Sequence, residues 1–435
     1  MHASIALIGV LAGLTWSWPT KRQDGDKPVY AHYMIGEIFD EHTRQDIEDA
    51  KSLGIDAFAL NFNKFAYWSN DTVERLFKNA DELDFGLFFS FDMAPGYFTD
   101  PAQYASYFQQ YAERPSYHRF KGKPLVSTFG GEAVSNDQWS SFKQTVGDVL
   151  VVPGFYEATP SPTFFSERTS LDGVFNWNSW PFPEDGKAAV SSKDDETYMA
   201  AARAADKFFM LGVSPLQFKH MDEGNNWYRR GEDNLERRIE QALELQSDMI
   251  ELQTWNDAGE SHYMGNIWDE PMTNSPIKDY VDGYDHKAYY QILPAFIQAF
   301  KRGDKDGKDM VPTNDKPVQG AFWHHTLLVD AECSADPLGK PGHVDNMEDV
   351  VSGIILVAKG KNNIVAVVKS GDKELGKIDL VEGYNKFKVE GLTTGKVQVE
   401  TWDGETMVGR GEGSLEVTDS GKLCNYNFQV VAIPS

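Results

Sequence analysis

Eight short apolar runs alternate with amphipathic stretches over about 275 residues of this chain, and this alternation constrains the fold more than any other feature. The runs cover residues 29–35, 57–62, 86–91, 125–129, 149–155, 173–177, 208–216 and 249–254. Eight strands alternating with helices are typical of a (β/α)8 barrel, in which parallel strands form a closed cylinder. A doubly wound open sheet is the alternative, but Gly36-Glu37-Ile38-Phe39 is not its usual glycine fingerprint. We therefore predict an α/β fold with a (β/α)8 barrel over residues 27–303.

The stretches between these runs have the apolar spacing of helices. Thr43 and Asp46 are spaced as a capping box, and Gly54 stands where a helix over 43–53 would end. Asp233 and Glu236 have the same spacing before the helix predicted at 233–245. Further helices are predicted at 72–83, 102–113, 138–146, 196–207 and 287–302, whereas 161–170 is predicted to be a loop.

The last quarter of the chain has a different pattern. Residues 304–316 are charged and rich in turn formers, and their glycine does not fit a calcium loop, so we interpret them as a linker. Short strands are predicted at 354–358, 364–368, 377–380, 386–389, 397–401 and 430–433. Residues 317–435 are therefore predicted to form a C-terminal all-β domain, a β-sandwich. The glycine-rich run at 409–413 is not followed by a helix, which argues against phosphate binding.

The N-terminus indicates export. Residues 4–18 form an apolar run of signal-peptide length, too short to span a bilayer comfortably, and Lys21-Arg22 is placed to suit trimming of a pro-segment. A hydrophobic first strand is the alternative. We predict that residues 1–22 are a signal peptide with a short pro-segment, and that the protein is secreted to the extracellular space or cell wall.

Two features fit export. Cys333 and Cys424 are the two cysteines of the chain, and a pair within one secreted domain usually forms a disulfide. Asn70 begins the sequon Asn70-Asp71-Thr72 and is a glycosylation candidate, which we expect on a surface loop.

The chain carries a formal net charge of −25. Such a polyanion is repelled by nucleic acid and by anionic membranes. We therefore expect no nucleic-acid partner and no membrane association after signal removal. The charge suits a neutral partner such as a polysaccharide, although it serves solubility equally well. No feature argues against a monomer.

The segment Trp255-Asn256-Asp257-Ala258-Gly259-Glu260-Ser261-His262 follows the last predicted barrel strand. Two acids, Asp257 and Glu260, lie three residues apart at the end of a buried strand, where a buried charge is costly to desolvate. Glycoside hydrolysis needs such a pair, because one acid protonates the leaving oxygen and the other activates water or attacks the sugar. The alternative is a polar loop that leaves the barrel without a chemical role.

Polar and aromatic residues follow most of the predicted strands, at the end where barrel active sites lie. Amides and acids bind sugar hydroxyls, and indole rings cover apolar sugar faces. The candidate substrate-binding residues are His32, Tyr33, Asn61, Glu132, Trp177, Asn178, Trp180, His220, Trp255 and Asn256, with Asp92 as a third candidate acid.

Several of these residues have a structural explanation as well. A lone histidine such as His32 is more often a hydrogen-bonded core residue than a ligand. Asp92 could cap a loop, and Glu132 could be a turn residue. A zinc hydrolase built from scattered histidines and Asp257 is a weaker alternative, because the chain has no closely spaced histidine pair or cysteine cluster. We predict no cofactor and no metal.

The motif at 255–261, with Phe89-Ser90-Phe91-Asp92 and Ala31-His32-Tyr33-Met34, resembles the fungal α-1,3-glucanases, or mutanases, of glycoside hydrolase family 71. The resemblance covers residues 27–302, and the trailing β-domain fits such enzymes. It implies an endo-acting hydrolase of α-1,3-glucan that inverts the anomeric centre. It also implies that Asp257 and Glu260 are the catalytic acids and that Asp92 takes part.

Inversion requires two carboxyl groups about 6.5–9.5 Å apart, with water between the base and the sugar. We predict that Glu260 is the general acid, with its pKa raised by a neighbouring carboxylate and apolar walls, and that Asp257 is the base. Two alternatives stay open: a barrel glycosidase for another α-linked polysaccharide, such as an endo-mannosidase, and a non-catalytic wall protein that only binds glucan.

Overall fold

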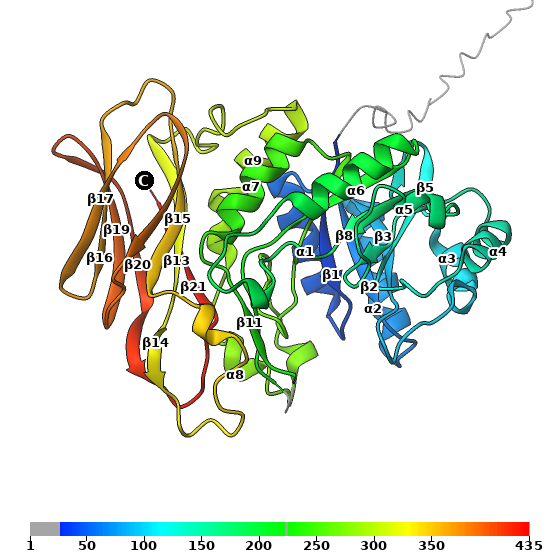
Figure 1. The fold of residues 1–435 in the computed structure, drawn as a ribbon, viewed down its shortest axis with the longest axis horizontal. Helices are drawn as coiled ribbons and strands as arrows, with labels where there is room; N and C mark the ends of the chain where they lie inside the picture. Colours follow the sequence, from blue (N-terminus) through cyan, green and yellow to red (C-terminus); the bar gives the residue numbers. More distant parts are fainter. Residues whose placement is uncertain (1–26, 222–224, 435) are drawn as a thin grey trace, which may run out of the picture.

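The computed structural model describes residues 27–221 and 225–434 of the chain. The predicted signal peptide and pro-segment lie outside the described residues. A barrel wrapped by helices is followed by a C-terminal part made of two β-sheets, and helices α7 and α9 lie between the two parts (Figure 1). No helix among the described residues is long and apolar enough to cross a membrane.

The barrel is closed by eight parallel strands, as predicted. They are β1 (Val29–Met34), β2 (Ala57–Phe62), β3 (Gly86–Asp92), β5 (Lys123–Phe129), β7 (Gly154–Phe155), β8 (Gly173–Asn176), β9 (Phe208–Val213) and β12 (Met249–Leu252). Each pairs with its neighbours in this order, and β12 pairs with β1 to complete the ring. Burial of both strand faces explains why the runs are almost continuously apolar.

Helices follow the barrel strands, and most of them cover the outside of the barrel. They are α1 (Asp40–Leu53), α2 (Ser69–Leu83), α3 (Ala105–Tyr111), α4 (Asn136–Val146), α5 (Phe164–Glu167), α6 (Lys193–Ala204), α7 (Asn234–Leu245), α8 (Lys278–Val281) and α9 (Leu293–Arg302). Helix α1 buries Ile47, Ala50 and Leu53 and ends at Gly54, whose φ of +91° suits glycine. It begins at Asp40, so the predicted cap at Thr43 is wrong, and residues 164–167 of the predicted loop form the short α5.

Shorter elements connect these strands and helices. The two-residue strands β4 (Arg119–Phe120) and β6 (Leu150–Val151) pair with β5. Strands β10 (Gln217–Lys219) and β11 (Trp227–Arg229) form a separate antiparallel hairpin after β9. The 3₁₀ turns are η1 (Pro101–Gln103), η2 (Pro183–Asp185), η3 (Glu270–Met272), η4 (Lys287–Gln291) and η5 (Val344–Asn346).

The C-terminal part is the predicted sandwich of two sheets. The sheet nearer the barrel has the order β18 (Gly383–Glu390), β15 (Val350–Val357), β13 (Val318–His325) and β21 (Phe428–Ile433). The outer sheet has the order β14 (Leu327–Glu332), β20 (Thr406–Ser420), β19 (Gly395–Asp403), β16 (Ile364–Ser370) and β17 (Lys373–Leu380). The glycine-rich run at 409–413 lies within β20, where a Cβ on Gly411 would be 2.3 Å from the carbonyl oxygen of Ala432.

The inner sheet joins the two parts of the protein. Strands β13 and β15 are buried along their whole length. Val318 and Phe322 of β13 pack into the sandwich core, whereas Ala321 and Trp323 belong to the core shared with the barrel. Because both faces of this sheet are apolar and covered, the sandwich is packed against the barrel through a shared apolar core.

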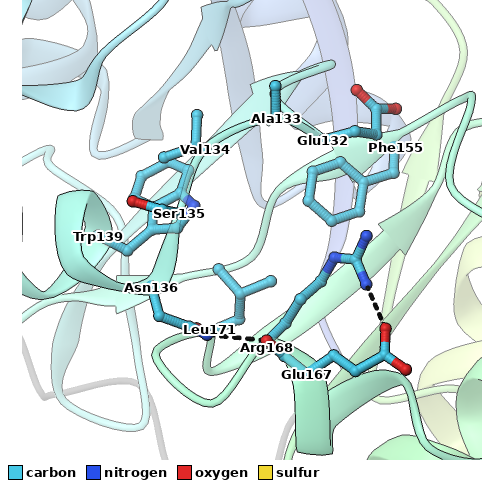
Figure 2. Close-up of a pocket in the computed structure, with 10 residues that line it drawn as sticks. All are labelled: Glu132, Ala133, Val134, Ser135, Asn136, Trp139, Phe155, Glu167, Arg168 and Leu171. Atoms are coloured by element: carbon cyan, nitrogen blue, oxygen red, sulfur yellow. Dashed lines mark hydrogen bonds and ion pairs between the residues drawn. The ribbon is translucent and has the colours of Figure 1, made fainter.

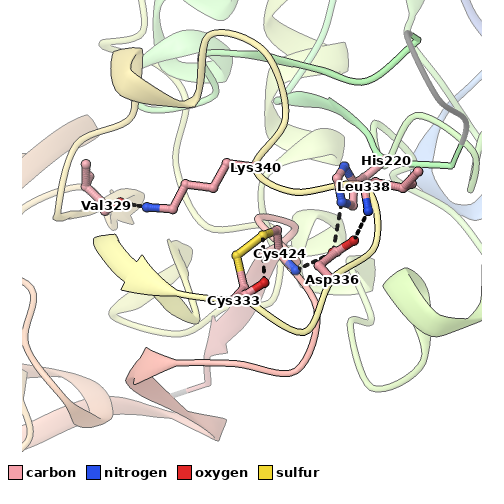
Figure 3. Close-up of a disulfide and its surroundings, with 7 residues drawn as sticks. All are labelled: His220, Val329, Cys333, Asp336, Leu338, Lys340 and Cys424. Atoms are coloured by element: carbon pink, nitrogen blue, oxygen red, sulfur yellow. Dashed lines mark hydrogen bonds and ion pairs between the residues drawn. A yellow bond between two sulfur atoms is a disulfide. The ribbon is translucent and has the colours of Figure 1, made fainter.

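The predicted disulfide is present. Cys333, after β14, is bonded to Cys424, before β21, with their Cα atoms 5.4 Å apart (Figure 3). Asp336 lies in the loop that this bond closes and accepts a hydrogen bond from the backbone N–H of Cys424 at 2.8 Å. Asn70 is exposed, but it lies in the first turn of α2 and not on a loop, so that part of the prediction is wrong.

Candidate active site

The loop after β12 folds back on itself and gathers the acids of the motif. The N–H of Thr254 donates to the carbonyl of His262 at 2.7 Å, and the N–H of Met264 returns to the carbonyl of Thr254 at 2.9 Å. The Thr254 hydroxyl accepts from the N–H of Asp257 at 2.9 Å, and Asp257 Oδ1 accepts from the N–H of Glu260 at 3.0 Å. These local bonds bring Asp257, Glu260 and His262 into one cluster at the carboxyl end of β12, where the motif predicts a site.

His262 lies between the two acids. Its Nε2 is 3.1 Å from Asp257 Oδ2 and 3.7 Å from Glu260 Oε2, and its side chain is fully buried. The acids themselves are accessible, with 16% of the Asp257 side chain and 25% of the Glu260 side chain exposed. Solvent can therefore reach both carboxylates.

The surroundings of the two acids move their pKa values in opposite directions. Burial alone would raise the pKa of Asp257, but the charge and hydrogen bond of His262 outweigh burial and lower it. Burial and the neighbouring Asp257 carboxylate raise the pKa of Glu260, against smaller opposing effects of His262 and Lys219. At a pH between these two pKa values, Asp257 is ionised and Glu260 holds a proton.

Asp92, at the end of β3, lies close to this cluster. Burial raises its pKa, the Asp257 charge adds to the rise, and hydrogen bonds from Ala94 and Asn61 oppose it. The Asn61 amide is 3.5 Å from Asp92 Oδ2, and both side chains are buried. Asn61 and Asp92, both predicted site residues, therefore lie together within electrostatic range of Asp257.

His32 lies beneath the acids and does not reach a sugar. Its ring is 1% exposed, and its Nδ1 is 2.7 Å from Glu251 Oε1 inside the barrel. The charge of His32 lowers the pKa of both Asp92 and Asp257. The prediction of a direct sugar contact is wrong, because the side chain is enclosed by the barrel interior and supports the acids electrostatically.

Two predicted contacts point away from the site. The Tyr33 hydroxyl donates to Asp46 of α1 at 2.8 Å, so its ring lies between β1 and the surrounding helices. Trp255 is 1% exposed and packs against Phe58 and Tyr290. Both predictions are wrong because neighbouring residues of an extended segment project to opposite sides, which strand-end position alone does not resolve.

Two further predicted contacts are buried behind the site. Trp180 is 2% exposed, with its ring centroid 5.3 Å from that of His262. His220 Nε2 is 2.9 Å from Asp336 Oδ2 in the C-terminal domain, and neither side chain is exposed (Figure 3). Neither Trp180 nor His220 can touch a sugar, because packing or the C-terminal domain covers it.

The other predicted residues line the barrel mouth with varied exposure. Trp177 is mostly buried and meets the His32 ring edge-on at 4.8 Å. The Asn178 amide donates to the carbonyl of Tyr156 at 2.8 Å, and Glu132 Oε1 accepts from the N–H of Tyr156 at 2.8 Å. Asn256 accepts from the N–H of Met34 and donates to its carbonyl, which fastens the motif loop to β1. These side chains order the loops, and the partly exposed Glu132, Asn178 and Asn256 remain candidates for sugar contact.

The β10–β11 hairpin supplies site residues that sequence reasoning missed. Gln217 Nε2 donates to Glu260 Oε2 at 2.5 Å. The charges of Lys219 and Glu260 interact, as do those of Arg229 and Glu260. The predicted apolar run ends at residue 216, so residues 217–219 were placed in the loop that follows it and the hairpin was not predicted.

A cavity of about 350 Å³ lies near the ends of β5 and β7 (Figure 2). Arg168 lies among its lining residues, 3.8 Å from Glu167, and the N-terminus of α4 borders it. Its lining includes Glu132 but neither Asp257 nor Glu260. The cavity is therefore adjacent to the candidate site and not its centre.

Among the described residues, one group of side chains could hold a metal ion. Asp257, Glu260 and His262 bring possible ligand atoms within 4.8 Å of one another. The same atoms already interact with one another and with Gln217, and a carboxylate pair of this kind is what acid–base hydrolysis requires. We therefore interpret the cluster as acid–base groups.

An eight-stranded barrel with two solvent-accessible acids of opposite pKa shift at its carboxyl end is the arrangement that a glycoside hydrolase needs. The Glycosyl hydrolase family 71 profile matches residues 25–435, nearly the whole chain. The protein thus belongs to glycosyl hydrolase family 71, as the motif resemblance predicted.

Curated relatives agree with this assignment over almost their full length. The chain is 29% identical over 417 residues to a glucan endo-1,3-alpha-glucosidase, agn1, of Schizosaccharomyces pombe, covering 93% of this chain and 94% of that protein. It is also 29% identical over 424 residues to a mutanase of Penicillium rubens, covering 94% and 88%. A solved endo-alpha-mannosidase of family GH99 from Bacteroides thetaiotaomicron has a TM-score of 0.50 at 14% identity, covering 65% of this chain and 98% of that one, and it supports the fold alone.

Proposed function

We propose that this protein is an endo-acting hydrolase of α-1,3-glucan, with Glu260 as general acid and Asp257 as general base. The observation that carries the proposal is the acid pair, in which burial and Asp257 raise the pKa of Glu260 while His262, 3.1 Å from Asp257, lowers the pKa of that acid. Membership of family 71 and the printed activities of two fungal relatives support the choice of glucan.

In this mechanism, Glu260 donates its proton to the glycosidic oxygen as the bond breaks. Asp257 removes a proton from the attacking water, and His262 stabilises the Asp257 carboxylate from behind. Asp92 accepts a hydrogen bond from a sugar hydroxyl or orients the water, since it lies within electrostatic range of Asp257.

We propose inversion, but the spacing of the acids does not by itself support it. One oxygen of Asp257 lies within 4.8 Å of one oxygen of Glu260, whereas inverting pairs are about 6.5–9.5 Å apart and retaining pairs about 5–5.5 Å. The family resemblance is therefore the support for this stereochemistry.

One experiment tests both activity and stereochemistry. The purified protein is incubated with α-1,3-glucan, new reducing ends are counted, and product anomers are followed by proton NMR. Immediate appearance of β-anomers from α-linkages supports inversion, and initial α-anomers refute it. Absence of reducing ends, together with co-sedimentation on the glucan, would instead indicate a binding protein, and preferential release from an α-mannan would overturn the choice of substrate.

Exposed aromatic rings around the barrel mouth support a polymeric substrate. In the described part of the chain, the exposed large aromatic side chains are Phe39, Phe65, Tyr67, Tyr97 and Phe182. All five lie on segments that follow barrel strands β1, β2, β3 or β8, on the same side as the acids. We propose that they form a platform on which sugar rings stack.

This platform is tested with Y67A, because Tyr67 is the most exposed of the five at 83%. KM for insoluble glucan should rise several-fold, while hydrolysis of a short soluble oligosaccharide should not change. V381A alters an exposed apolar residue of the C-terminal domain and serves as the matched control. Equal effects of the two variants would contradict the platform.

We propose that the mature protein is secreted and monomeric. The disulfide fits an oxidising compartment, and the curated relatives are fungal proteins, one of which is named for the ascus wall. Cell fractionation and light scattering test these two points.

A further inference from the structure

The β10–β11 hairpin stands between the catalytic acid and the C-terminal domain. Its two strands pair Gln217 with Arg229, Phe218 with Tyr228, and Lys219 with Trp227. Since successive side chains of a strand point to opposite faces, the hairpin has two distinct surfaces.

One surface faces Glu260. The Gln217 amide donates to the Glu260 carboxylate, and the Lys219 and Arg229 charges act on the same group. The backbone adds a further bond, because the N–H of Phe218 donates to the carbonyl of Glu260 at 2.9 Å. The hairpin therefore holds both the main chain and the side chain of residue 260.

The opposite surface faces the C-terminal domain. Phe218 meets Tyr426 edge-on at 6.2 Å, and the Tyr228 hydroxyl is 2.8 Å from His325 Nε2. His220, two residues beyond Phe218, is 2.9 Å from Asp336 Oδ2. All of these hairpin side chains are buried. The Tyr228 hydroxyl also donates to Glu232 at 2.8 Å, whereas Asp336 is the hydrogen-bond partner of His220 Nε2.

Two further contacts fix the domain side of this interface. The N–H of Tyr228 donates to the carbonyl of Gly342 at 2.9 Å, which extends the hairpin by one bridge into the C-terminal domain. Asp336 is itself held by the N–H of Cys424 and lies in the loop closed by the Cys333–Cys424 disulfide (Figure 3). The segment that carries the partner of His220 is thus held by the disulfide at Cys333 and by this hydrogen bond.

We propose that the C-terminal domain positions the catalytic acid: His220, held by Asp336 of the disulfide-closed loop, fixes the hairpin whose Gln217 orients Glu260. The inference rests on the proposed role of Glu260. His220 and Gln217 are positioning residues, because neither is placed to exchange a proton with the substrate.

The role of Glu260 is tested first, in the full-length protein. E260Q should lose hydrolysis of α-1,3-glucan and keep hydrolysis of an α-linked oligosaccharyl fluoride, because fluoride leaves without a proton. If E260Q hydrolyses glucan at the wild-type rate, the proposed function fails. If it shows the expected split, the positioning of Glu260 can be tested separately.

H220A and Q217L are then compared on the same two substrates. Glucan hydrolysis should fall about 10- to 100-fold, the cost of a displaced catalytic group, while fluoride hydrolysis changes by less than about threefold. H220Q keeps an amide donor toward Asp336 and should recover most of the glucan rate. The double variant H220A/Q217L should lose little more than either single variant, because both act through one contact.

Y384F is the matched control, since Tyr384 donates to the carbonyl of Glu236 across the domain interface without contacting the hairpin. It should leave both rates unchanged. Equal loss on both substrates in H220A, or an unchanged glucan rate, would overturn the proposal. Should H220A fail to fold, D336N, which is isosteric with the native residue, replaces it in the test. D336N must lower the rate of glucan hydrolysis more than the rate of fluoride hydrolysis, by a smaller factor than expected for H220A. Equal effects on the two rates, or no effect on either, would overturn the proposal.

Discussion

Replacement of each acid by its amide should change activity in the same direction and stability in opposite directions. In E260Q the proton donor is lost while shape and the acceptor for Gln217 are kept. General acid catalysis contributes about 10²–10⁴ in rate, so the barrier should rise by roughly 3–5 kcal/mol. D257N removes the base and should have a comparable cost.

Stability separates the two variants because their pKa shifts have opposite signs. The folded pKa of Glu260 is raised, so its ionised form destabilises the folded protein above that pKa and has no effect below the unfolded value near 4.5. E260Q should therefore unfold at a higher temperature than the wild type at neutral pH, and this advantage should disappear in acid.

For Asp257 the sign is reversed. Its folded pKa is lowered, so the ionised form stabilises the folded state above the unfolded pKa, and this contribution is lost as pH falls through the folded pKa. D257N should therefore be less stable than the wild type at neutral pH. Thermal unfolding at several pH values, with reducing-end assays on glucan, checks both variants. Shifts of the same sign in both variants, or retention of more than about a tenth of the rate, would refute the reasoning.

Three further outcomes are expected. The rate should depend on pH as a bell, and H262Q should move both limbs to higher pH, because His262 lowers the pKa of Asp257 and of Glu260; a shift of one limb alone would contradict this. Removal of divalent ions with EDTA should leave the rate within about twofold, since a metal-dependent hydrolase would lose its nucleophile, and recovery of a lost rate by added metal would overturn the acid–base assignment. Replacement of Cys333 and Cys424 by serine should lower the free energy of unfolding by roughly 4–5 kcal/mol at most, because the disulfide closes a loop with a sequence separation of 91 residues. Denaturant unfolding of the variant and of the wild type, with and without reductant, measures this difference, and equal free energies of unfolding would contradict it.

The sequence by itself determined the barrel, because each strand is buried on both faces and must be a short apolar run. It also determined the acid pair, since Asp257 and Glu260 are brought together by bonds within one loop, such as that from the N–H of Glu260 to Asp257. The disulfide followed from having two cysteines in one domain. The barrel strands and the acid pair depend on local sequence pattern, and two cysteines allow one intramolecular disulfide.

Only the tertiary structure decided which side chains face the substrate. Tyr33 and Trp255 stand at strand ends as predicted, yet their rings pack outward against the helical layer. His220 also follows a barrel strand in the sequence, but its side chain binds Asp336, which is 116 residues away in the chain. Side-chain direction and long-range partners depend on how distant segments pack, and no local period of the sequence encodes that packing.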